Sequence, residues 1–98
     1  MGKTVRLYEK KGETSIFIDA GITDAGDLQI SGQDIGEAPK KIFGDIDYEY
    51  WLTVRSEHKD RVLLALIERM FLNNPSVVSE FQGFLKAKGI PCEFDSYV

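Results

Sequence analysis

Hydrophobic and polar residues alternate in three short stretches near the start of the chain. In residues 4–8, Val5 and Leu7 fall on one side, and Leu28 and Ile30 do the same in residues 27–31, while residues 15–19 are rich in β-branched side chains. Successive side chains of a strand point to opposite faces, so this pattern predicts three half-buried strands in an antiparallel meander.

Residues 48–54, almost wholly aromatic and β-branched, predict the strongest strand of the chain. A helix is predicted next, over about residues 57–71, with Ser56 as its N-cap. A second helix begins at Pro75 with Asn74 as cap and stops at Gly89, whose freedom at positive φ suits a helix end. A last strand is predicted over residues 92–97.

This order, β-β-β-β-α-α-β, predicts the α+β class: an antiparallel sheet with both helices on one face. A length of 98 residues suits one domain, so residues 1–98 are expected to form a single two-layer domain. Residues 32–47 break the pattern with three glycines, Pro39 and the Lys40-Lys41 pair, and read as a long irregular connection. Connections of this length are often functional.

The sheet face turned away from the helices is expected to mix aromatic rings with charged and polar groups. Its predicted members are Arg6, Tyr8, Phe17, Asp19, Gln29, Glu49, Trp51, Thr53 and Glu93. Tryptophan and tyrosine often anchor interfaces, so this face is a candidate binding surface. In the alternative, residues 32–47 fold over it and bury Phe17 and Trp51 beneath Ile42, Phe43 and Ile46.

Charge narrows the classes of partner. Twelve basic and sixteen acidic residues give a net charge of −4, which disfavours nucleic acid and anionic membrane surfaces. Between Asp19 and Glu37 there are five acids and no base. Such a one-signed patch would steer a basic protein partner, although a solvated surface that keeps the protein soluble has the same composition.

The longest apolar run, residues 62–67, is far shorter than the roughly 20 residues of a membrane-spanning helix. The N-terminal residues lack the apolar core of a signal peptide, and a single cysteine, Cys92, suits a reducing compartment, so a cytoplasmic location is expected. Cys92 and His58 are too few ligands for structural zinc.

No catalytic motif is present, and neither an enzymatic activity nor a cofactor is expected. Cys92 alternates with Phe94, which favours a small core residue over the nucleophile of a thiol-imidazole pair with His58. Side chains that would converge for acid/base work or for a hard metal are Gln33, Asp34, Asp45, Asp47 and Glu49. Asp45 and Asp47 more plausibly cap the start of the following strand.

Three segments resemble a group of small bacterial proteins of unknown activity. They are a GQD-x-G stretch at residues 32–36, an acidic aromatic DYEY strand at residues 47–50, and a GIP-x-EF ending at residues 89–94. The resemblance implies a bacterial source and a shared α+β domain, and it transfers no catalytic residue.

The sequence therefore predicts a non-enzymatic interaction module with a loop-and-sheet surface. The residues expected to form it are Gln33, Asp34, Glu37, Asp45, Asp47, Glu49 and Trp51. An immunity or antitoxin factor that masks a basic toxin is one protein of this kind. The alternative is a small-ligand or metal site between residues 32–47 and the sheet, with Gln33, Asp34 and Tyr50 as polar contacts. The protein partner and the oligomeric state stay open.

Overall fold

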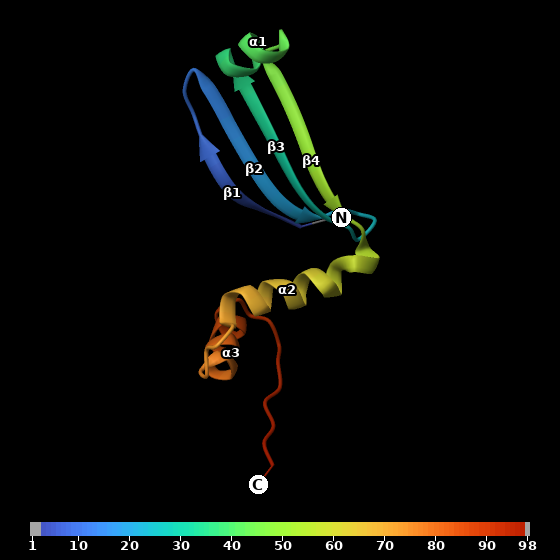
Figure 1. The fold of residues 1–98 in the computed structure, drawn as a ribbon, viewed down its shortest axis with the longest axis vertical. Coiled ribbons are helices and arrows are strands. Elements are labelled where there is room, and N and C mark those ends of the chain that lie inside the picture. Colours follow the sequence, from blue (N-terminus) through green and yellow to red (C-terminus); the bar gives the residue numbers. More distant parts are fainter. Residues whose placement is uncertain (1–2, 98) are drawn as a thin grey trace. The chain divides into compact units, whose positions relative to one another are not determined.

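The computed structural model describes residues 3–97 and divides the chain into two compact units, one ending at Val62 and the other beginning at Leu63 (Figure 1). The first unit contains a four-stranded antiparallel sheet in which the strands lie in chain order. Its strands are β1 (Thr4–Lys10), β2 (Thr14–Ile22), β3 (Leu28–Gly36) and β4 (Asp47–Val54).

The pairing register sorts the strand residues into two faces, because neighbours directly opposite each other share a face. We call one the polar face. One row across this face consists of Arg6, Asp19, Ser31 and Trp51. A second row consists of Glu9, Phe17, Gln33 and Glu49. We call the other the apolar face. One row across it consists of Val5, Ala20, Ile30 and Leu52. A second row consists of Tyr8, Ile18, Gly32 and Tyr50.

The predicted position of Tyr8 on the same face as Arg6 is wrong, because β1 contains a bulge. Arg6 pairs with Asp19, but Tyr8 pairs with the very next residue of β2, Ile18, so Leu7 is an extra residue in the ladder. An extra residue reverses the alternation that follows it. Tyr8 therefore lies on the apolar face and does not share the polar face with Arg6.

The prediction of an irregular connection over residues 32–47 is wrong. The first five of these residues complete β3, and the short helix α1 (Glu37–Phe43) follows. Gly36 makes the transition: its φ is 130°, its N–H donates to the Ile46 carbonyl at 2.7 Å, and a Cβ there would lie 2.0 Å from the Glu13 carbonyl oxygen. Only glycine fits that position.

Helix α1 is attached to the end of the sheet, where β3 finishes and β4 begins (Figure 1). Thr14 Oγ1 accepts a hydrogen bond from the Ala38 N–H at 2.9 Å, and Phe43 stacks on Tyr48 with ring centroids 4.4 Å apart. Tyr48 pairs with Asp34 and so belongs to the apolar face, whereas Trp51 on the polar face is 60% exposed. The alternative in which residues 32–47 bury Trp51 is therefore wrong.

The first unit ends with a 3-10 turn, η1 (Ser56–His58), that leads into α2 (Lys59–Phe71). Ser56 is not the predicted N-cap, because it is the first residue of η1 and Arg55 occupies the N-cap position. The backbone N–H of Ser56 donates to the Asp27 carboxylate, which comes from the turn between β2 and β3.

The second unit contains the rest of α2 and the helix α3 (Val77–Ala87). Phe71 and Phe81 meet edge to face with centroids 6.0 Å apart. Helix α3 begins two residues later than predicted. Asn74 Oδ1 accepts a hydrogen bond from the Ser76 N–H at 2.9 Å, which closes a turn before the helix. Its predicted stop at Gly89 is confirmed: φ there is 67°, and the Ile90 N–H reaches back to the Leu85 carbonyl at 2.9 Å.

The predicted last strand over residues 92–97 is wrong, because these residues form an extended segment outside any strand. Cys92 is exposed, so it is not the small core residue the alternation favoured. With Phe94 it lines an apolar hollow of about 230 Å³ against α3, whose wall includes Phe81 and Leu85.

The α+β class is confirmed, with an element order of β-β-β-α-β-α-α in place of the predicted one. The packing of α2 and α3 on one face of the sheet, and a single domain over residues 1–98, stay predictions. Between residues 3 and 97, no helix combines the length and the apolar character needed to cross a membrane.

Candidate functional site

A hollow of about 430 Å³ opens on the polar face of the sheet. Ser31 and Gln33 of β3 lie at its floor, between Phe17 of β2 and Trp51 of β4. Neighbouring strands are about 4.8 Å apart, so β2 and β4 lie roughly 10 Å from each other. Small or flexible side chains between two rings leave the space open. The lining residues are Arg6, Phe17, Asp19, Ser31, Gly32, Gln33, Glu49 and Trp51.

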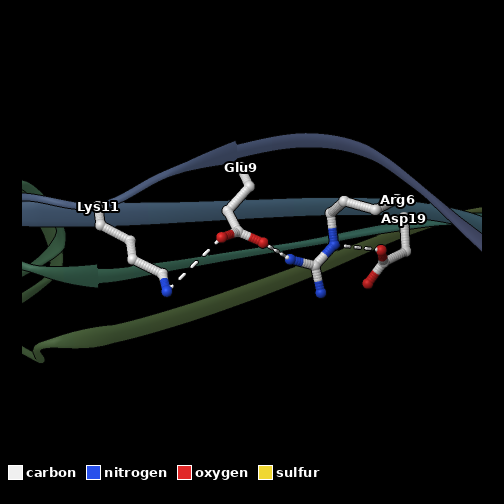
Figure 2. A network of polar contacts seen from close by, with 4 residues as sticks. All are labelled: Arg6, Glu9, Lys11 and Asp19. Atoms are coloured by element: carbon white, nitrogen blue, oxygen red, sulfur yellow. Dashed lines mark hydrogen bonds and ion pairs between the residues drawn. The ribbon is translucent and has the colours of Figure 1, made fainter.

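On the β1 side, two of the lining residues, Arg6 and Asp19, belong to an ionic network (Figure 2). Arg6 Nε donates to Asp19 Oδ1 at 2.6 Å, and Arg6 also pairs with Glu9, which in turn meets Lys11 Nζ at 3.6 Å. The guanidinium lies 5.2 Å from the centroid of the Phe17 ring. The hydrogen bond to Asp19 raises the pKa of Arg6, so its charge is permanent.

On the β4 side, the same kinds of group are present without a cation. Trp51 is 60% exposed, and Glu49, two residues before it, is also exposed on the same face. None of the ion pairs formed among residues 3–97 involves Glu49. This side of the hollow therefore offers an aromatic ring and a carboxylate to a ligand.

The floor of the hollow is connected to its rim by Gln33. Its Nε2 donates to both carboxylate oxygens of Asp47, at 3.1 and 3.3 Å. Four carboxylates, of Glu9, Asp19, Asp47 and Glu49, lie in or next to the hollow together with the two cations of Arg6 and Lys11. These six side chains therefore carry a formal charge of −2, which favours a cation over an anion.

Four of the seven residues predicted to bind a partner come together here. Gln33, Glu49 and Trp51 line the hollow, and Asp47 is bonded to Gln33. The other three lie elsewhere in the first unit. Asp34 is on the apolar face, where its Oδ1 accepts from the Tyr50 hydroxyl at 3.2 Å; Glu37 is in the first turn of α1; Asp45 Oδ1 accepts from the Asp47 N–H at 3.1 Å in the turn before β4.

The residues predicted from the sequence to bind a partner include none from β1 or β2, although both strands contribute to the site. Arg6, Phe17 and Asp19 were assigned to the same face as Trp51 but were not counted among the binding residues. Their alternation was the available signal, and the register adds what the pattern lacks: Asp19 and Trp51 both pair with Ser31, one from each side.

The alternative pocket between residues 32–47 and the sheet is not the hollow observed. Only Gly32 and Gln33 of that segment line it, while Asp34 and Tyr50 meet on the opposite face. In the part of the chain that the structure describes, no three histidine, cysteine, aspartate or glutamate side chains gather as metal ligands would.

Comparisons with protein-family models, with curated proteins and with solved structures find no match to this chain. The resemblance to small bacterial proteins stays a prediction. Function is therefore argued from the geometry of the hollow.

Proposed function

We propose that the protein is a non-enzymatic interaction module that binds a basic segment of a partner protein in the hollow of the polar face. The observation that supports this most directly is Trp51, which is 60% exposed beside Glu49, a carboxylate that forms none of the ion pairs found among residues 3–97. Tryptophan carries much of the binding energy in many interfaces, because one ring buries a large area at little cost in side-chain entropy.

The charge of the surface supports a basic partner. The excess of carboxylates around the hollow is part of the chain's net charge of −4, and both attract a cationic segment before contact. An uncharged or acidic segment gains nothing from this field. Masking of a basic toxin by a bacterial cytoplasmic immunity or antitoxin factor is the biological role we attach to this chemistry.

The lining of the hollow also supports binding over catalysis. Its one hydroxyl nucleophile candidate is Ser31, and none of the lining residues is a histidine, a cysteine or a lysine that would activate it. Asp19, which pairs with Ser31 across the strands, is already held by Arg6. These side chains are arranged to recognise charge.

The test is a titration with a short peptide of mixed lysine and arginine, compared with an acidic peptide of the same length, in isothermal calorimetry at low and moderate salt. The wild-type protein should bind only the basic peptide. Glu49→Gln and Trp51→Ala should each weaken binding about tenfold, equivalent to about 1.4 kcal/mol. Glu57→Gln removes the same charge from η1, outside the hollow, and should bind like the wild type.

Absence of binding by the wild-type protein would overturn the proposal. Equal binding by all variants would move the interaction away from the hollow. Circular dichroism of each variant distinguishes lost binding from lost folding.

A further inference from the structure

We infer that, given the proposed function, the hollow receives the guanidinium of an arginine side chain from the partner, stacked on Trp51 and paired with Glu49. Lysine, the other basic side chain, is not the group the geometry favours. Four features of the polar face lead to this assignment.

The first is that this face already holds one guanidinium. Arg6 reaches Asp19 and Glu9 with different nitrogens (Figure 2). Its guanidinium lies 5.2 Å from the centroid of the Phe17 ring. One ring and two carboxylates thus surround the group in the manner typical of arginine, which combines stacking with several directed hydrogen bonds.

The second feature is that β4 also presents an aromatic ring and a carboxylate, with no guanidinium from the described residues between them. Trp51 corresponds to Phe17 as the aromatic surface, and Glu49 corresponds to the carboxylates of the β1 side. The indole is the ring that attracts cations most strongly, and 60% of Trp51 is exposed. Glu49 has two oxygens available and no ion pair within the described residues.

The third is the placement of Gln33 between the two halves. Its Nε2 is turned to Asp47, at 3.1 and 3.3 Å from the two carboxylate oxygens, which leaves the amide oxygen as an acceptor at the floor. A guanidinium has five N–H donors in a planar fork and so uses acceptors on two sides. An ammonium group is a compact, strongly hydrated charge and gains less from such a spread of acceptors.

The fourth is size. A volume of about 430 Å³ accommodates a whole arginine side chain, and the roughly 10 Å between β2 and β4 leaves room for a flat group lying against one ring. Anionic ligands are disfavoured, because Arg6 on the β1 side is committed to Asp19 and Glu9.

The experiment uses the single tryptophan of the chain, since Trp51 fluorescence reports directly on the hollow. Two peptides of equal length and charge, one with arginine and one with lysine as its only cations, are titrated into the protein. The arginine peptide should change the Trp51 emission and bind at least about tenfold tighter. N-acetyl-arginine amide should give the same spectral change at higher concentration, and N-acetyl-lysine amide should not.

Two variants make the result specific. Glu49→Gln should remove most of the preference for arginine, whereas Glu57→Gln should preserve it. Equal affinity for the two peptides would overturn the arginine assignment while leaving the proposed binding of a basic partner intact. Failure of both peptides to bind would overturn the proposed function together with this inference.

Discussion

The Asp27 carboxylate accepts a hydrogen bond from the backbone N–H of Ser56 at 2.8 Å. The other carboxylate oxygen lies 3.2 Å from the Arg55 guanidinium, and the backbone N–H of Asp27 donates to Thr23 Oγ1 at 3.1 Å. Asp27 is only 7% exposed, although it is charged. The turn between β2 and β3 therefore provides the acceptor that the start of η1 lacks, and it fixes the point where the chain leaves β4.

Replacing this carboxylate should destabilise the protein. Asp27→Ala leaves the Ser56 N–H without its partner, and we expect a loss of about 2 kcal/mol in the free energy of unfolding, measured by urea denaturation. Asp27→Asn keeps an acceptor oxygen and should lose about half as much. Arg55 is 73% exposed, so Arg55→Ala, which removes only the ion pair, should change stability by less than about 1 kcal/mol.

If Arg55→Ala proved as costly as Asp27→Ala, the ion pair would dominate at this junction and the backbone acceptor role would be wrong. Thr23→Ala offers a further check, because it removes the hydroxyl that accepts from Asp27 without changing any charge.

The sequence predicted those parts of the molecule that follow from local alternation. The grouping of Phe17, Asp19, Glu49 and Trp51 on one face was predicted, because each lies in a strand with a regular period of two. Alternation cannot reveal a bulge, and the extra residue Leu7 moved Tyr8 to the opposite face. Asp34 was predicted to bind a partner from an irregular connection, but β3 runs on to Gly36 and turns Asp34 toward Tyr50.

Other errors arose where a long-range contact decided the structure. The composition of residues 37–43 favoured a loop, and the short helix there is started from another strand by Thr14. The alternating residues 92–97 have the composition of a strand but extend without strand partners in the described chain. The hollow itself depends on the register between four strands, which no single segment encodes.

Gly32 should tolerate alanine only when Tyr50 is removed. The two residues are cross-strand neighbours, and a Cβ on Gly32 would lie 2.2 Å from Cε2 and Cζ of the Tyr50 ring. Gly32→Ala must therefore displace the ring from Asp34, at a cost of about 1–3 kcal/mol in urea denaturation. In a Tyr50→Ala background the same change should be nearly neutral, because the obstruction is gone. Additive effects in this double-mutant cycle would contradict the close contact.

The Tyr50 hydroxyl should ionise above the ordinary pKa of a tyrosine. Burial raises its pKa above the ordinary value of 10.0, and the hydrogen bond it donates to Asp34 raises the pKa further. An ultraviolet titration of the wild-type protein and of Tyr50→Phe measures this pKa, because the phenol that the variant lacks should be the one with the raised pKa. Asp34→Asn should lower the pKa of Tyr50 but leave it raised, since burial is the larger cause.

The raised pKa of Tyr50 also determines how the stability of the fold changes with pH. The folded protein holds the Tyr50 proton more tightly than the unfolded chain does, so its contribution is complete below pH 10.0 and is lost as the pH rises through the folded pKa. Tyr50→Phe should show a shallower loss of stability in this alkaline range. An identical slope for the two proteins would contradict the assignment.

Two glycines of the second unit should respond to alanine in opposite directions. A Cβ would meet nothing within 4 Å at Gly83 or at Gly89, so crowding plays no part at either position. Gly83 lies inside α3, where alanine should stabilise the helix by about 0.5–1 kcal/mol. Gly89 has a φ of 67°, and alanine there should cost about 1 kcal/mol. Denaturation followed by helical circular dichroism measures both. A destabilising Gly83→Ala would contradict an uncrowded helical position at Gly83, and a neutral Gly89→Ala would contradict the left-handed conformation of Gly89.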